Sequence, residues 1–121
     1  MNPLNVRVVD DSTLAAKKVD ATLEELGHQV VATARSGDEA LEAYEQHRPD
    51  LVTLDITMPG MDGIETVKEM LERFPKAQII MVTSNDMAKL VLQALKSGAK
   101  GYVVKPVSPE KLQEQIAQTE T

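Results

Sequence analysis

Six polar residues that could carry chemistry each come at the end of a short apolar run of the chain. They are Asp10 and Asp11, Asp55, Thr83 and Ser84, and Lys105. If the apolar runs are parallel strands, all six side chains lie at the carboxyl edge of one sheet, which is where open α/β sheets bind ligands. If the first and third strands are also neighbours, the three carboxylates converge.

Three carboxylates in one crevice repel each other and raise each other's pKa unless a cation joins them. Because Asp10, Asp11 and Asp55 offer only oxygen ligands, with no His or Cys beside them, the set suits a hard divalent ion. Mg²⁺ fits best, since it is often held by one or two carboxylates while bridging to a phosphate. With Lys105 and the hydroxyl of Thr83 added, the set predicts phosphoryl transfer to an Asp, which forms an acyl phosphate.

Each motif taken alone has an ordinary structural explanation. Asp10 and Asp11 before Ser12 are typical of a helix N-cap with acidic residues near the helix dipole. Asp55 alone could cap the turn that follows it, and Lys105 with Pro106 could be a surface turn. The combination at successive strand ends favours a site.

The elements that must position these residues alternate between two patterns. Helical spacing separates the apolar runs; for example, Leu14, Val19, Leu23 and Leu26 are predicted to face inward before Gly27. A second helix is predicted from the capping-box pattern Ser36–Glu39, and a fifth begins at Ser108-Pro109. The predicted strands are Val6–Val9, Gln29–Ala34, Leu51–Leu54, Gln78–Val82 and Tyr102–Val104.

Five strand–helix units in strict alternation predict an α/β fold. Parallel neighbours need crossover connections, and these helices cover both faces of the sheet, so the expected architecture is a doubly wound (βα)5 domain. A chain of 121 residues is one domain by length.

Composition excludes several classes of protein. Aromatic residues make up only 2%, so the core must be aliphatic, and the absence of cysteine excludes a disulfide framework and thiolate metal sites. No apolar run approaches the length of a membrane span, and the amino terminus has no signal-peptide pattern, so we expect a cytoplasmic protein without membrane contact. A net charge of −6 without a basic stripe argues against direct nucleic-acid binding.

Three further residues are expected to have structural roles only. Arg7 lies in a predicted central strand, where we expect its side chain to reach water near the start of the strand. His28 is expected at the turn into the second strand and His47 at a helix end, both solvated and away from the pocket.

The ordered set of motifs resembles the receiver domain of two-component response regulators, most closely the stand-alone receivers of chemotaxis. It comprises Asp10-Asp11, Asp55 with Met58-Pro-Gly-Met-Asp-Gly63, Thr83, and Gly101-Tyr-Val-Val-Lys105-Pro106. The resemblance covers essentially the whole chain. It implies a flavodoxin-like strand order of 2-1-3-4-5 and a receiver domain over residues 1–121 with no output domain.

The resemblance also implies the roles of the acidic residues. Asp55 would accept a phosphoryl group from the phosphohistidine of a sensor histidine kinase. Asp11, Asp55 and the backbone carbonyl of Thr57 would bind Mg²⁺ directly, with Asp10 acting largely through water.

The remaining motif residues would form the switch. Lys105 would pair with the phosphate, Thr83 would bond to it after transfer, and Ser84 is small enough to leave it accessible. The ring of Tyr102 would follow Thr83, and the Lys105–Pro106 bond would be cis. The last strands and helices would then repack.

A partner surface is expected on the fourth helix, the fifth strand and the fifth helix. Its residues are Lys89, Leu92, Lys96, Tyr102 and Lys111. Leu92 flanked by lysines predicts contact with an acidic partner, such as a flagellar motor switch protein or another effector. We expect a monomer, with dimerisation on phosphorylation left open.

Three alternatives remain beside the stand-alone receiver. The chain could be the receiver of a larger regulator, a chemotaxis methylesterase or a transcription factor. An aspartyl-phosphate phosphohydrolase would place a second Asp where this chain has Thr57, so that enzyme class is disfavoured. A flavin-binding protein would need a Ser/Thr/Gly-rich loop after the first strand. The residues Thr57 and Asn85 leave the phosphate lifetime open.

Overall fold

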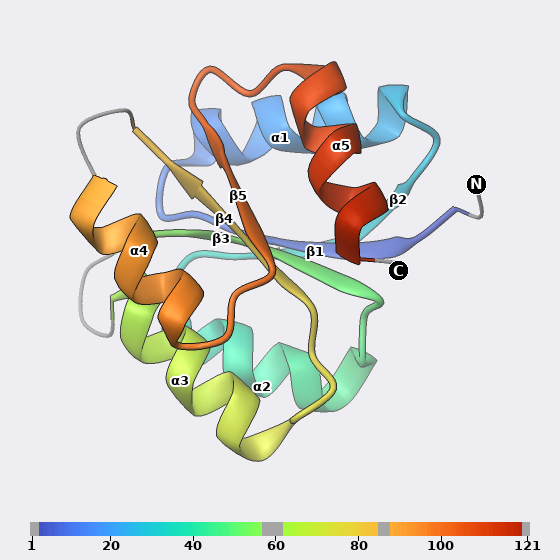
Figure 1. The fold of residues 1–121 in the computed structure, drawn as a ribbon. Coiled ribbons are helices and arrows are strands. Elements are labelled where there is room, and N and C mark those ends of the chain that lie inside the picture. The colour runs from blue at the N-terminus through green and yellow to red at the C-terminus, as the bar shows by residue number, and fades with distance from the viewer. Residues whose placement is uncertain (1–2, 57–61, 85–87, 120–121) are drawn as a thin grey trace.

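A five-stranded parallel sheet lies between two layers of helices in the computed structural model, which describes residues 3–56, 62–84 and 88–119 (Figure 1). The strands are β1 (Asn5–Val9), β2 (Gln29–Ala34), β3 (Leu51–Asp55), β4 (Ile79–Thr83) and β5 (Gly101–Val104). The helices are α1 (Thr13–Glu25), α2 (Gly37–His47), α3 (Gly63–Arg73), α4 (Ala88–Lys96) and α5 (Pro109–Thr119).

The strand order is β2-β1-β3-β4-β5, which confirms the order implied by the resemblance. The chain first adds β2 on one side of β1 and then continues on the other side with β3, so the direction of winding reverses between β1 and β3. All four strand pairs are parallel, and their carboxyl ends therefore lie along one edge. Ligands bind at such a reversal point in open α/β sheets.

The two faces of the sheet carry separate apolar cores, as the predicted fold requires, and one of them contains the aromatic rings of Tyr44 and Phe74 among its aliphatic side chains. Helices α1 and α5 cover one face, and α2, α3 and α4 cover the other (Figure 1). The central strands β3 and β4 are buried along their whole length, because helices pack on both of their faces. No helix in the described part of the chain is long and apolar enough to cross a membrane.

Helix starts agree well with the capping patterns. The hydroxyl of Ser36 accepts a hydrogen bond from the amide of Glu39 at 3.2 Å, and the hydroxyl of Ser108 accepts one from the amide of Lys111 at 3.1 Å. A cap that the sequence patterns had not identified is Asp62, whose carboxylate accepts from the amide of Glu65 at 2.9 Å at the start of α3.

The predicted inward position of Leu14 is wrong. Leu14 is 66% exposed, and the buried residues of α1 are Ala16, Val19 and Leu23. A helix turns by about 100° per residue, so a residue five positions before Val19 is displaced by about 140° around the helix. Leu14 therefore faces solvent at the carboxyl edge of the sheet.

Two polar residues expected in solvent are buried instead. Arg7 is only 2% exposed, so the prediction that its side chain reaches water is wrong. His28 is also buried, and its Nδ1 accepts a hydrogen bond from the amide of Leu4 at 3.1 Å, joining the turn before β2 to the start of β1. His47 at the end of α2 is exposed, as expected.

Candidate functional site

Three carboxylates meet at the carboxyl edge of the sheet. Asp10 and Asp11 follow β1, and Asp55 is the last residue of the neighbouring strand β3. Each offers an oxygen within 4.8 Å of the other two. Asp10 and Asp55 are buried, and Asp11 is exposed. The convergence expected if the first and third strands are neighbours is therefore observed.

Backbone contacts hold Asp10 in place. Its amide donates to the carbonyl of Ala34 at 3.0 Å, which continues the pairing of β1 with β2. Its Oδ1 accepts from the amide of Ser12 at 2.9 Å, while the hydroxyl of Ser12 caps α1 by accepting from Ala15. The N-cap of α1 and the acidic group are thus linked, because Asp10 belongs to the acidic group and also binds the amide of the capping residue Ser12.

Lys105 brings a positive charge to the two buried carboxylates. Its Nζ lies 3.2 Å from Oδ2 of Asp10 and 3.7 Å from Oδ2 of Asp55. The backbone amide of Lys105 donates to the carbonyl of Thr83 at 2.7 Å, so the pairing of β4 with β5 positions the side chain. One ammonium group among three carboxylates leaves the site negative, which favours a further cation.

Thr83 and Tyr102 line a common pocket beside the acidic group. Thr83, the last residue of β4, is buried, and its hydroxyl donates to the carbonyl of Ser84 at 3.1 Å. Ser84 is exposed. The pocket has a volume of about 210 Å³ and also contacts Val91 of α4. Tyr102 is 43% exposed, and its side chain lines this pocket together with Thr83.

Gly63 allows α3 to approach the end of β3. A Cβ atom there would lie 2.5 Å from the carbonyl oxygen of Asp55 and 2.7 Å from Cα of Ile56, which no side chain permits. The amide of Gly63 donates to the carbonyl of Ile56 at 2.8 Å. The sequence motif that ends at Gly63 does not by itself predict this close approach. The position of Gly63 directly after the N-cap Asp62 is the signal that could have found it.

Two implied features have different outcomes. The Lys105–Pro106 bond is cis, in agreement with the resemblance. Thr57, implied as a metal ligand through its carbonyl, lies outside the described residues, as does Asn85.

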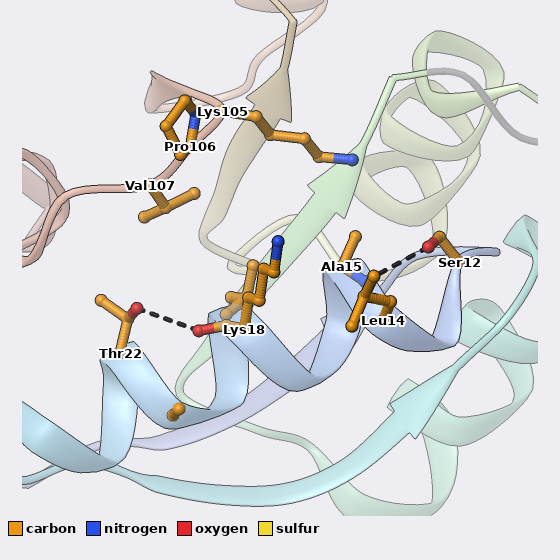
Figure 2. A pocket seen from close by; sticks show the side chains of 10 residues that line it. Ser12, Leu14, Ala15, Lys18, Thr22, Lys105, Pro106 and Val107 are labelled. Carbon is orange, nitrogen blue, oxygen red and sulfur yellow. Dashed lines mark hydrogen bonds between the residues drawn. The ribbon is translucent and has the colours of Figure 1, made fainter.

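A pocket lined by Ser12 and Lys105 adjoins the acidic site (Figure 2). It has a volume of about 640 Å³ and lies between α1 and the segment that follows β5. Figure 2 shows Lys18 extending from α1 toward the segment that carries Lys105, Pro106 and Val107, and Leu14 also lines the pocket from α1. The exposed Leu14, placed wrongly from the sequence, thus lines an apolar surface next to the site.

The expected partner residues are all exposed. Leu92 is 54% exposed on α4, between the exposed side chains of Lys89 and Lys96. Lys111 is exposed on α5. Tyr102, on β5, is 43% exposed. The expected partner residues thus lie on α4, β5 and α5, outside the acidic group.

Comparison with known proteins identifies similar chains. The family model of the response regulator receiver domain matches residues 6–117. The chain is 40% identical over 114 residues to chemotaxis protein CheY of Bacillus subtilis, covering 94% of this chain and 95% of that protein. It is also 42% identical over 108 residues to a protein-glutamate methylesterase/protein-glutamine glutaminase of Nitratidesulfovibrio vulgaris, covering 87% of this chain and 29% of that protein.

Among solved structures, one similar chain comes from the CheX–CheY–BeF3–Mg²⁺ complex of Borrelia burgdorferi. Its TM-score is 0.91 at 36% identity, covering 98% of this chain and 90% of that chain. The similarity therefore extends over nearly the whole chain.

Proposed function

Because the chain belongs to the receiver domains of two-component response regulators, we propose that Asp55 accepts the phosphoryl group that operates this signalling switch. The observation that carries the proposal is the position of Asp55 at the end of a central strand, beside Asp10, Asp11 and the ammonium group of Lys105.

The transfer forms one bond and breaks one. A carboxylate oxygen of Asp55 attacks phosphorus, and the bond from phosphorus to the donor nitrogen of a phosphohistidine breaks. The imidazole leaves with the electron pair and takes up a proton. Lys105, already 3.7 Å from Asp55, stabilises the charge on the transferred oxygens.

The donor set suits Mg²⁺. Asp10, Asp11 and Asp55 supply only oxygen ligands around a net negative charge, and the carbonyl of Thr57 is the further ligand that the family resemblance implies. When bound, Mg²⁺ supplies positive charge that offsets the charge of the phosphoryl group. The Mg²⁺ named in the Borrelia burgdorferi complex supports this assignment.

The switch acts through Thr83 and Tyr102. A phosphate on Asp55 attracts Lys105 and the hydroxyl of Thr83, which gives up its bond to the carbonyl of Ser84. Movement of Thr83 opens space that the ring of Tyr102 takes, using the pocket that both residues line. Ser84 leaves the phosphate accessible, and the α4–β5–α5 surface changes.

Two surfaces then serve two partners. The apolar pocket beside Leu14 adjoins Lys105, which suits a phosphodonor protein, a sensor histidine kinase. Leu92 with Lys89, Lys96, Tyr102 and Lys111 forms a separate surface for an acidic downstream partner. The similarity to CheY proteins supports chemotaxis as the pathway, with a flagellar motor switch protein as one such partner and this chain acting as a monomeric, cytoplasmic, single-domain receiver.

A receiver of a longer regulator is the second candidate. The similarity to a methylesterase, of which this chain covers 29%, supports it. The chemistry of Asp55 is the same in both cases, and only the element that responds differs.

Phosphorylation by a small donor tests the proposal. Incubation with Mg²⁺ and acetyl phosphate should add one phosphoryl group by intact-mass spectrometry, stable in acid and labile in base. Asp55→Asn should remove the label, while Asp38→Asn, on the exposed face of α2, should keep it. Equal labelling of Asp55→Asn would reject the assignment.

The two surfaces are tested by a reciprocal pair of variants. Leu14→Ala should slow transfer from a histidine kinase but not from acetyl phosphate, because only the protein donor needs the pocket. Leu92→Ala should leave both transfers unchanged and lower the affinity of the phosphorylated protein for its downstream partner. Unchanged partner affinity in Leu92→Ala would place that interface elsewhere.

A further inference from the structure

Arg7 carries a charge that no described residue neutralises. Its side chain is 2% exposed, and its Nε is buried without a hydrogen-bond partner in the described part of the chain. The ion pairs found among the described residues involve other side chains. Burial lowers the pKa of the Arg7 guanidinium, but from a value so high that the group stays charged. An unpaired buried charge is costly, so a complementary group is expected.

Local packing directs this side chain toward the edge of the sheet. Arg7 pairs with Ala32 of the edge strand β2 and with Val52 of β3. A register shift between Val6 and Arg7 places the small side chain of Ala32 beside Arg7. An alanine leaves room where a larger residue would close the space between β2 and α2.

A cavity of about 270 Å³ occupies that space. Arg7 and the buried residue Ala34 contribute to its inner wall, and exposed residues of β2 and α2 form its rim. The rim side chains are Thr33, Glu39, Glu42, Gln46 and His47. The cavity shares no lining residue with the acidic group at the carboxyl edge.

The charges of this cavity are arranged by depth. Arg7 is a buried lining residue, whereas Glu39 and Glu42 are exposed lining residues, and Oε2 of Glu39 also accepts from the hydroxyl of Ser36 at 3.4 Å. Neither glutamate is within ion-pair distance of Arg7 among the contacts of the described residues. A doubly charged anion would be repelled at the rim, whereas a ligand with a carboxylate and a neighbouring cationic group would match both charges.

We propose that this cavity binds a small zwitterion of the α-amino acid type, with its carboxylate on Arg7 and its ammonium group toward Glu39 and Glu42. The planar guanidinium binds carboxylates through two parallel hydrogen bonds, which gives both affinity and orientation. The amide of Gln46 is a further polar group at the rim. The volume is at the small end of ligand pockets, so a nucleotide or cofactor does not fit.

Titration followed by ¹⁵N–¹H NMR tests the proposal on the unphosphorylated chain. Glycine and L-alanine should shift the amides of Ala32, Thr33 and Ala43 in a saturable way at millimolar concentration. Acetate and inorganic phosphate should act at least tenfold more weakly. Arg7→Met should abolish the saturable shifts. Arg7→Lys keeps the positive charge but lacks the two parallel N–H donors of the guanidinium, so it should weaken binding. Arg35→Met is the matched control on an exposed arginine and should change nothing.

The rim is tested by the double variant Glu39→Gln with Glu42→Gln. Amino-acid binding should fall at least tenfold, while acetate binding stays equal or improves. The proposal is overturned if glycine and alanine give no saturable shift at tens of millimolar, or if the shifts persist in Arg7→Met. The two Glu→Gln substitutions should also be introduced into the wild-type protein and into Arg7→Met. If they destabilise the wild-type protein but not Arg7→Met, the proposal is overturned, because Arg7 would then be paired with Glu39 and Glu42 themselves.

Discussion

Strand β1 leads to two buried charges, three residues apart, with opposite surroundings. Asp10 accepts from the amide of Ser12 and pairs with Lys105, whereas Arg7 has no ion pair among the described residues. Asp10 lies at the carboxyl edge, where residues after β1 and β5 converge. Arg7 lies within the strand, under α2. A buried charge at the carboxyl edge contacts residues from several elements. A buried charge within a strand can be paired only by a group that binds in the space between the sheet and the neighbouring helix.

The largest effect is expected from breaking the pair at the edge. Lys105→Met leaves Asp10 buried without its cation and should lower the free energy of unfolding by about 2 kcal/mol without Mg²⁺. Added Mg²⁺ should restore part of the loss, because it binds only the folded site. Urea denaturation with and without Mg²⁺ measures both, and Lys68→Met, an exposed lysine of α3, is the control. A loss that Mg²⁺ does not reduce would contradict the pairing.

Removing the exposed carboxylate at the carboxyl edge of the sheet should lower the affinity for Mg²⁺ rather than the stability of the protein. Asp11→Ala is expected to weaken Mg²⁺ binding at least tenfold, about 1.4 kcal/mol, with little change in stability because Asp11 is exposed. Isothermal titration with Mg²⁺ checks this, with Asp38→Ala for comparison. Equal affinity in the two variants would mean that the exposed carboxylate is not a ligand.

Removing the buried charge of Arg7 in β1 should raise the free energy of unfolding, whereas removing that of Lys105 should lower it. Arg7→Met replaces an unpaired buried guanidinium with an apolar side chain of similar length and should stabilise the protein by about 1 kcal/mol. The gain should be equal at pH 6 and pH 9, because an arginine side chain stays charged throughout this range. A destabilisation in urea denaturation would show that the protein itself pairs Arg7.

The smallest effect on stability is expected at Asp20 on α1, whose carboxylate is only partly buried. Burial first, and repulsion from Glu24 second, raise the pKa of Asp20 above its ordinary 3.8. The folded state therefore holds the proton more tightly, and stability falls as the pH rises through the raised pKa. Asp20→Asn should add only about 0.3 kcal/mol at pH 7, since solvent screens a half-buried carboxylate, and nothing below pH 3.8. Denaturation at several pH values checks this trend.

The sequence predicted the features that depend on local pattern. Alternating apolar runs and capping residues identified all five strand–helix units, and polar residues at strand ends identified Asp10, Asp55 and Lys105. The strand order came from the family resemblance, because alternation alone does not say which strands are neighbours.

Features that depend on three-dimensional contacts were missed. The burial of Arg7 follows from the register of β1 with β2 and from the size of Ala32 beside it. The role of Gly63 follows from the approach of α3 to Asp55. Leu14 was misplaced for a different reason, since its rotation around α1 was predictable from helix geometry.

The most direct test is to locate the phosphoryl group itself. Reduction of the acyl phosphate with borohydride converts the modified aspartate into homoserine, which peptide mass spectrometry places on a single residue. After reaction with acetyl phosphate and Mg²⁺, we expect homoserine at position 55 and none when Mg²⁺ is chelated. Homoserine at position 10 or 11, or equal conversion without Mg²⁺, would contradict the proposed acidic site.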